Sequence, residues 1–299
     1  MATLYTHRDE NIAKTWVLMS VFLCVVIGIG WAISWYFNNP GILVFAVIFA
    51  LAMNVSAYWW SDKVVIATAG AKPADPAQYP ELHRLTENLC ITAGLPKPKL
   101  YVIDDPAPNA FATGRNAEHA ALAVTSGLLN MMDDNELQGV LAHELSHIGN
   151  RDMLVSTVAV VLVGFVTLAA NFFWRATWLG AGRRGNDREG NNPLMLIIAV
   201  AFIILAPIFA TLIQLAISRK REFLADASGA LLTRYPEGLA SALRKIGGYE
   251  RPMLRANNAT AHLFISNPFG PREAMSGLAK LFSTHPPIEE RIKALVGDA

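Results

Sequence analysis

The amino-acid sequence predicts a mainly α-helical fold with a small β-sheet and about four transmembrane helices. Of the 299 residues, 53% are hydrophobic and only 16% are charged, and the mean hydropathy is +0.32. Soluble domains normally carry about 25% charged residues, so this composition favours a protein of the lipid bilayer. Helical periodicity dominates between the apolar runs, and only a few short segments have strand character. The net charge of +1 argues against nucleic acid as a main partner.

The first 61 residues are expected to form a polar segment followed by a transmembrane hairpin. Residues 1–14 are polar and are expected to lack fixed structure. Residues 15–61 contain no Asp, Glu, Lys or Arg, and the turn-forming residues 38–41 divide them into two apolar runs, 16–37 and 42–60. Each run is long enough to cross about 30 Å of hydrocarbon as a helix. The first run is too long for the core of a signal peptide, which predicts a retained anchor.

Residues 62–152 have the composition of a soluble domain and are expected to form its first part. Apolar residues occur there at helical spacing in some segments and at strand spacing in others, with turn residues between them. The expected elements are helices at 80–93 and 126–131, a strand at 100–103, and a hairpin formed by 109–113 and 120–125. Ser126 is the expected cap of the short second helix.

A longer helix is expected to follow, with signals at both of its ends. Asp133 and Glu136 have the spacing of a capping box, and Gly149 is the expected stop signal. Between these ends lies the motif His-Glu-x-x-His, which begins at His143 and ends at His147. Residues four apart lie on the same face of a helix, so the two imidazoles can point at one metal ion.

This motif predicts a site for one Zn²⁺ per chain and peptide hydrolysis as its chemistry. The two imidazoles would supply two of the three protein ligands that a catalytic zinc site needs. Glu144 lies beside them in the sequence. It is the expected general base, because a carboxylate at that position can take a proton from the attacking water.

The second half of the chain begins with another pair of apolar segments. Residues 153–218 contain a third apolar run, 153–174, and a fourth, 191–218, whose densest part is 194–215. Residues 175–192 are rich in Gly, Arg and Asn and are expected to form a flexible loop. Length and lack of charge predict membrane association for both runs, and leave open whether each run crosses the bilayer completely.

Residues 219–299 are expected to form the second part of the soluble domain. Helical patterns are expected at 222–232 and 236–246, and a final helix is expected to end at Val296. Residues 250–281 contain several Pro and Gly residues and are expected to be a loop.

Glu222 is the best candidate for the third zinc ligand. No Cys follows residue 90, and no further histidine lies shortly after His147. Asp226 lies one helical turn after Glu222, on the same face, and is expected to accept a hydrogen bond from the second nitrogen of a ligand histidine. Cys24 and Cys90 have neither metal-site nor redox spacing, so both are expected to be buried free thiols.

The basic residues that flank the apolar runs predict the orientation of the chain. These residues are Arg8, Lys14, Lys63 and residues 219–221. The positive-inside rule places them, both termini and the domain at 62–152 in the cytoplasm. The four arginines of loop 175–192 conflict with this orientation, because that loop would lie outside.

Three motifs resemble those of the HtpX-type membrane zinc metalloproteases, which are gluzincins related to the CAAX prenyl endopeptidases. The motifs are His143-Glu144-x-x-His147, Asn150-Arg151-Asp152 and Glu222-x-x-Ala225-Asp226, and the resemblance spans nearly the whole chain. It implies a zincin-like metalloprotease domain in the cytoplasmic membrane. It also implies a role in stress response and quality control, with unfolded or damaged membrane proteins as substrates.

The resemblance implies further site residues. Asn109-Ala110-Phe111 is similar to the family's Asn-Ala-aromatic segment, an edge strand that can bind an extended substrate by strand addition. His285 and Arg291 resemble the histidine and arginine that steady the oxyanion of the tetrahedral intermediate in this family.

Two alternative functions stay open at this point. A CAAX-type prenyl endopeptidase ranks lower, because four apolar runs are fewer than expected for the large chambered enzymes of that branch. A catalytically silent zinc-binding membrane scaffold also ranks lower, because a scaffold has no need of Glu144. Detection of turnover separates the enzyme from the scaffold. No oligomeric state is predicted.

Overall fold

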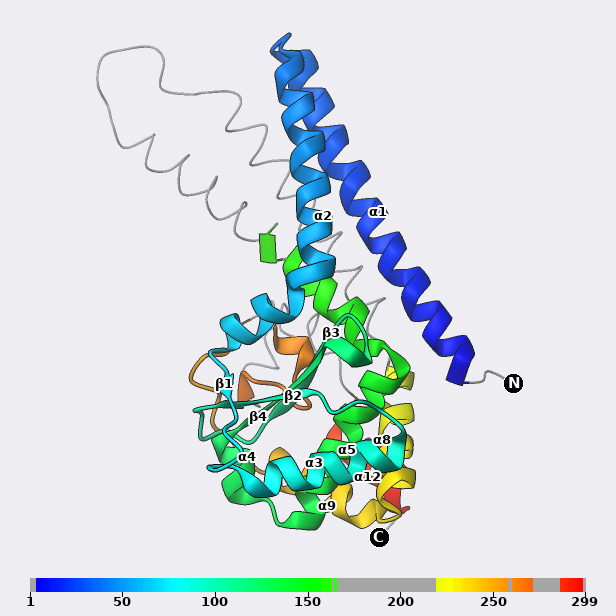
Figure 1. Cartoon of the computed structure of the whole chain (residues 1–299), viewed down its shortest axis with the longest axis vertical. Helices are drawn as coiled ribbons and strands as arrows, with labels where there is room; N and C mark the ends of the chain where they lie inside the picture. Colours follow the sequence, from blue (N-terminus) through cyan, green and yellow to red (C-terminus); the bar gives the residue numbers. More distant parts are fainter. Residues whose placement is uncertain (1–3, 163, 166–218, 258–259, 271–285, 298–299) are drawn as a thin grey trace, which may run out of the picture.

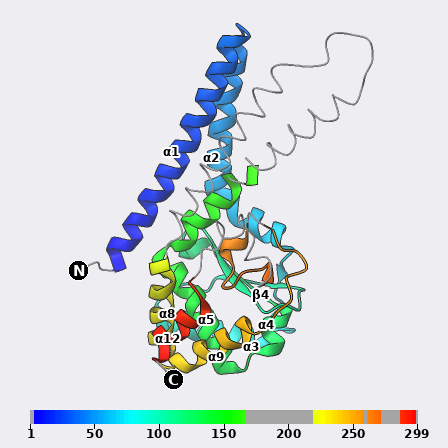
Figure 2. The same cartoon turned by 180° about the vertical axis from the view of Figure 1, so that it is seen from behind.

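The computed structural model describes residues 4–162, 164–165, 219–257, 260–270 and 286–297. Loop 175–192, the fourth apolar run and the end of the third run lie outside the described residues, as does His285. In the described part, two long helices stand as an antiparallel hairpin on a body of shorter helices and one sheet (Figures 1 and 2). The expected mainly α fold with a small sheet is therefore confirmed.

The hairpin consists of α1 (Leu4–Tyr36) and α2 (Pro40–Ala69). Both helices are long and apolar enough to cross a membrane. Asn39 caps α2, because its side-chain oxygen accepts a hydrogen bond from Gly41 N at 3.0 Å. The expectation that residues 1–14 lack fixed structure was wrong, since α1 already begins at Leu4. The polar side chain of Asn11 is buried against other polar groups of the protein, so its polarity does not indicate exposure to solvent.

A four-stranded sheet forms the centre of the body, in the order β1-β2-β4-β3. The strands are β1 (Lys72–Pro73), β2 (Lys99–Ile103), β3 (Ala110–Gly114) and β4 (Ala120–Thr125). β3 and β4 form the expected antiparallel hairpin, and β2 pairs with β4 in parallel. β1 was not predicted, because two residues are too short to show a period.

The two faces of the sheet pack against different helices, which explains why α2 runs past its expected end at residue 60. Ala121 and Ala123 of β4 face a cluster that contains Val65 and Ile66 from the end of α2. Leu122 and Val124 face the opposite cluster, formed by the helices of the body. Alternate residues of a strand point to opposite faces. The helix α2 is thus long and apolar enough to cross a membrane, and its last turns pack in the core of the body.

The remaining described helices surround the sheet. They are α3 (Pro80–Ala93), η1 (Ala117–His119), α4 (Ser126–Met131), α5 (Asp134–Asn150), an apolar helix at Asp152–Leu162, α8 (Arg219–Thr233), α9 (Pro236–Gly247), η2 (Ala261–Leu263) and α12 (Ile288–Val296). The bounds of α3 and α4 agree with the prediction, and those of α8 and α9 differ from it by one to three residues at an end. The central helix is α5, which contacts α3, α8, α9 and β3.

The predicted start signal of α5 is confirmed, and its predicted stop signal is wrong. The capping box is present: Asp133 Oδ1 accepts from Glu136 N, and Glu136 Oε2 accepts from Asp133 N, both at 2.9 Å. Gly149 does not stop the helix. Instead Arg151 adopts the left-handed conformation with φ 56°, and a new helix starts at Asp152.

Two smaller expectations were also wrong. Thr125, and not Ser126, caps α4, because the Thr125 hydroxyl accepts from Leu128 N at 3.1 Å. The Ser126 hydroxyl instead donates to Asp105 O. Cys24 is exposed on α1, whereas Cys90 is buried as expected. Burial raises the pKa of the Cys90 thiol to about 11, which keeps it protonated and unreactive.

Candidate metal centre

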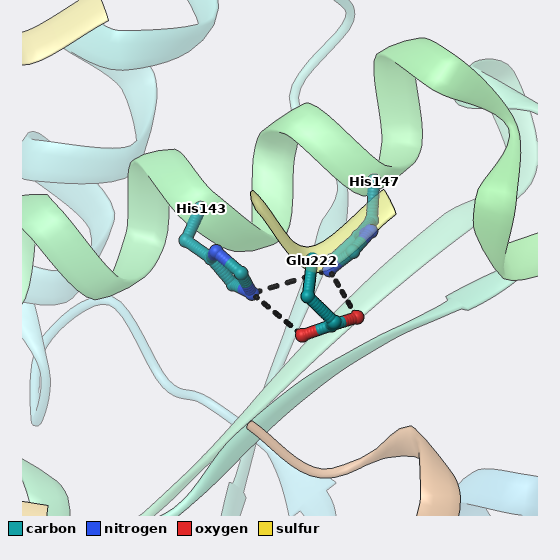
Figure 3. A group of neighbouring side chains, drawn as sticks. All are labelled: His143, His147 and Glu222. Atoms are coloured by element: carbon teal, nitrogen blue, oxygen red, sulfur yellow. Dashed lines mark hydrogen bonds and ion pairs between the residues drawn. The ribbon is translucent and has the colours of Figure 1, made fainter. Parts of the chain in front are cut away.

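α5 and α8 bring together the three residues that were expected to hold a metal. His143 and His147 project from successive turns of α5 toward Glu222 of α8 (Figure 3). The two Nε2 atoms lie 3.2 Å apart. Glu222 Oε2 lies 3.8 Å from Nε2 of His143, and its Oε1 lies 3.6 Å from Nε2 of His147. Each residue offers one donor atom, and the three atoms lie within 4.8 Å of one another.

These separations fit a zinc ion. Zinc bonds of about 2.0–2.2 Å in tetrahedral geometry place neighbouring donor atoms about 3.3–3.6 Å apart. The separations of 3.2–3.8 Å lie close to that range. Two imidazole nitrogens and one carboxylate oxygen are also a donor set that catalytic zinc sites use, with the fourth position left for water or substrate.

The close approach of α8 to α5 depends on a small residue. Gly229 follows Glu222 and Asp226 at i+7 and i+3, so all three lie on one face of α8. A Cβ atom at Gly229 would lie 3.0 Å from the backbone nitrogen of His143 and 3.2 Å from the carbonyl carbon of Ala142. Glycine therefore lets the two backbones meet at the distance from which Glu222 reaches the histidines.

The second nitrogen of each imidazole faces a buried carboxylate. His143 Nδ1 lies 2.9 Å from Asp226 Oδ1, as expected, and His147 Nδ1 lies 3.1 Å from Asp152 Oδ2. A hydrogen bond from Nδ1–H fixes the tautomer and leaves the Nε2 lone pair free for a metal. The role of Asp152 was missed by the sequence analysis. The left-handed turn at Arg151 places the carboxylate of Asp152 next to His147. Nothing in the local sequence pattern indicates that turn.

Burial and neighbouring charges shift the pKa values of the two histidines in opposite directions. Burial lowers the pKa of His143 to about 4, despite the hydrogen bond to Asp226. Burial also opposes a charge on His147, but the hydrogen bond to Asp152 and the charge of Glu222 outweigh it and raise the pKa of His147 to about 9. The carboxylates that favour a proton on His147 equally favour a cation at its Nε2.

Glu144 is almost completely buried, with 2% of its surface exposed. Burial raises the pKa of its carboxyl group to about 7, and nearby Glu222 also raises it. A carboxyl group with a pKa near neutrality can both accept and return a proton.

A pocket of 40 Å³ lies in front of these groups. Glu144, the three candidate ligands, Ala112 of β3 and Ile265 are among the residues that line it. A volume of this size admits an ion together with water. His262 also lines the pocket, with its Nε2 3.3 Å from Ser156 O, although no spacing in the sequence connects it with the motif.

Comparison with known proteins decides the family. Residues 76–299 match the family described as Peptidase family M48. The chain belongs to peptidase family M48. It is therefore a metalloprotease with a metal cofactor and protein substrates, and its two long apolar helices fit association with a membrane.

Relatives described as "Protease HtpX homolog" match the M48 chain over nearly its whole length. The relative from Thermoanaerobacter pseudethanolicus is 49% identical, and that from Caldanaerobacter subterraneus subsp. tengcongensis is 48% identical; each match covers 98% of this chain and 97% of the relative. The Pyrococcus furiosus relative is 47% identical over 94% of both chains. The crystal structure of S. mikatae Ste24p aligns with a TM-score of 0.49 and 19% identity, over 95% of this chain and 67% of that one.

The expected substrate-binding residues of the M48 chain are buried inside the protein and do not form an open strand edge. β3 is an edge strand as expected, but Asn109, Ala110 and Phe111 are all buried. The carbonyl of Ala110 already accepts a hydrogen bond from Ile265 N at 2.9 Å, and the Asn109 amide donates to Ser266 O. The segment at Ile265 therefore occupies the edge of β3 at Ala110, whereas Ala112 of the same strand lines the pocket.

Arg291 also differs from the expectation that it contacts the oxyanion. It is fully buried, with 0% of its surface exposed, and is not among the described residues that line the pocket. Its Nε and Nη2 donate to the two carboxylate oxygens of Asp226 at 2.8 and 2.7 Å, and its Nη1 donates to Ile265 O. Burial alone would raise the pKa of Asp226, but the hydrogen bonds from Arg291 and His143 lower it to about 2.

Proposed function

We propose that the M48 chain is a zinc endopeptidase in which His143, His147 and Glu222 hold one Zn²⁺. The observation that carries this proposal is the cluster of donor atoms: the two Nε2 atoms lie 3.2 Å apart, and the Glu222 carboxylate faces both of them, with one oxygen 3.8 Å from His143 and the other 3.6 Å from His147. The carboxylates behind both histidines support it further, because they favour the tautomer that binds metal.

The catalytic step divides among a few groups of the chain. When bound, Zn²⁺ supplies Lewis-acid polarisation of the scissile carbonyl and lowers the pKa of the attacking water. Glu144 takes the proton of that water and gives it to the leaving amine, for which its pKa of about 7 is suitable. Asp226 and Asp152 hold the two histidines in place during this exchange. The buried Glu144 has no comparable use in a silent scaffold.

Arg291 acts in this proposal as a positioning residue. Its two parallel hydrogen bonds hold the Asp226 carboxylate, and Asp226 in turn holds His143. Bidentate pairs of this kind fix geometry as well as charge. Stabilisation of the oxyanion then remains the proposed role of His285, which lies outside the described residues.

The proposed location is the cytoplasmic membrane, with the catalytic body in the cytoplasm. The basic residues at the ends of the hairpin support this orientation. The body also lies directly at the base of the hairpin: Arg115, in the turn between β3 and β4, stacks over the ring of Trp59 of α2 at 4.4 Å. A catalytic body attached directly to the hairpin suits substrates that emerge from the bilayer, so we propose unfolded or damaged membrane proteins as substrates.

We expect the purified full-length protein in proteoliposomes to cleave a heat-damaged membrane protein much faster than the intact form. The catalytic groups lie within a pocket of 40 Å³, so a peptide bond of an unfolded chain should reach them more easily than one held in a folded domain. Gel analysis of cleavage products over time, with Glu144→Gln as the inactive control, measures this difference. Equal cleavage of both forms would contradict the quality-control role. Preferred cleavage of a prenylated C-terminal peptide would favour the CAAX-type alternative.

A further inference from the structure

The first turns of α1 lie beside the metal centre. Figures 1 and 2 show the start of α1 next to the start of α8, far along the helix from the hairpin turn. Asn11 faces the body there and has only 1% of its surface exposed. A buried Asn needs hydrogen-bond partners for both its NH₂ group and its oxygen, so its contacts show which segments of the protein it connects.

Asn11 contacts the two segments that carry the ligands. Its Nδ2 donates to Asp152 Oδ1 at 2.6 Å and to Asn150 O at 3.2 Å, where α5 ends. Its Oδ1 accepts from Arg221 Nη1 at 3.0 Å. Arg221 directly precedes the candidate ligand Glu222 on α8. One side chain of α1 thus connects the end of α5 with the start of α8.

Asp152 connects Asn11 with the metal centre. The two oxygens of this carboxylate face different partners: Oδ1 faces Asn11, and Oδ2 lies 3.1 Å from His147 Nδ1. A carboxylate is planar and rigid, so a partner that fixes one oxygen also fixes the direction of the other. Arg221 lies 3.6 Å from Asp152 Oδ1, too far to fix that oxygen as Asn11 does at 2.6 Å.

We propose that Asn11 is a positioning residue for the metal centre, acting on His147 through Asp152 and on the Glu222 segment through Arg221. The first membrane helix then completes the site that the body provides. This inference rests on the proposed zinc site. It assigns to α1 a part in metal binding beyond that of an anchor.

Full-length variants in detergent test this proposal. Asn11→Ala removes both functions of the amide. Asn11→Asp keeps the volume and the acceptor for Arg221, but places a carboxylate against Asp152. Thr15→Val is the matched control, because Thr15 is equally buried one turn later and its hydroxyl donates, among the described residues, only to Asn11 O of its own helix. For each variant we would record the visible absorption of the Co²⁺ form, Zn²⁺ release to a chelator, kcat, KM and thermal unfolding.

We expect Asn11→Ala to weaken metal binding about 10-fold, at the lower end of the range for loss of an outer partner, because Arg221 still lies near Asp152. The Co²⁺ spectrum should change, and kcat should fall more than KM rises. Asn11→Asp should be at least as impaired, whereas Thr15→Val should match the wild type. If Asn11 only tied α1 to α8, Asn11→Asp would pair with Arg221 and retain wild-type metal binding, which would overturn the inference.

The outcomes separate this inference from the proposed function. If the wild type binds neither Co²⁺ nor Zn²⁺ at one ion per chain, the zinc site itself is wrong and the inference falls with it. If the wild type binds metal and both Asn11 variants bind it equally well with an unchanged spectrum, only the inference is overturned. If Asn11→Ala does not fold, Asn11→Asp gives the decision.

Discussion

Replacement of Glu222 by alanine is expected to remove metal binding and peptide cleavage together. In the part of the chain that the structure describes, Glu222 supplies the one carboxylate that faces Nε2 of both His143 and His147. Without it two ligands remain, fewer than any catalytic zinc site uses. The affinity for Zn²⁺ should fall by more than the ~10–100-fold that the loss of an outer partner costs. Zinc content after equilibration with a weak chelator, measured with cleavage of an unfolded protein, checks both effects.

Glu237→Ala is the matched control for this substitution, because Glu237 is an exposed glutamate at the start of α9. It should retain one zinc per chain and full activity. If Glu222→Ala also retained stoichiometric zinc and normal cleavage, the third ligand would lie elsewhere. The contact between α5 and α8 would then not form the metal site.

Replacement of Glu144 by glutamine should leave the metal in place and abolish cleavage. The amide has nearly the same shape as the buried carboxyl group but cannot accept the proton of the attacking water. General-base catalysis contributes about 10²–10⁴-fold, so kcat should fall by that factor. Because Glu144 is not one of the candidate ligands, zinc content should stay at one ion per chain.

Steady-state cleavage of an unfolded protein, with KM and kcat fitted separately, measures the effect of Glu144→Gln. Little change is expected in KM, since the group acts on the proton and not on substrate affinity. Turnover equal to that of the wild type would exclude Glu144 as the base. A wild type that binds zinc and cleaves nothing would favour the silent scaffold.

The parts of the site that lie on one helix could be predicted from the sequence. His143 and His147 are four residues apart, as are Glu222 and Asp226, and helical geometry places each pair on a common face. Asp133 and Glu136 likewise marked the start of α5 correctly, because a capping box is a local interaction.

The parts that depend on contacts between distant segments could not be predicted. Asp152 reaches His147 only because Arg151 takes a left-handed conformation that is rare for a residue other than glycine. Asn11 and Arg221 are 210 residues apart in the sequence but form a hydrogen bond in the fold. The same limitation applies to two other residues. Only the fold reveals that Ile265 N bonds to the carbonyl of Ala110 in β3. Only the fold reveals that Arg291 pairs with Asp226.

Removal and restoration of the metal tests the central claim most directly. Wild-type protein in detergent would be stripped with a chelator, dialysed, and assayed for cleavage of an unfolded protein before and after addition of Zn²⁺. The account predicts that cleavage disappears with the metal and returns in full at one Zn²⁺ per chain. Undiminished cleavage by the stripped enzyme, or a reconstituted enzyme that binds one Zn²⁺ and cleaves nothing, would contradict it.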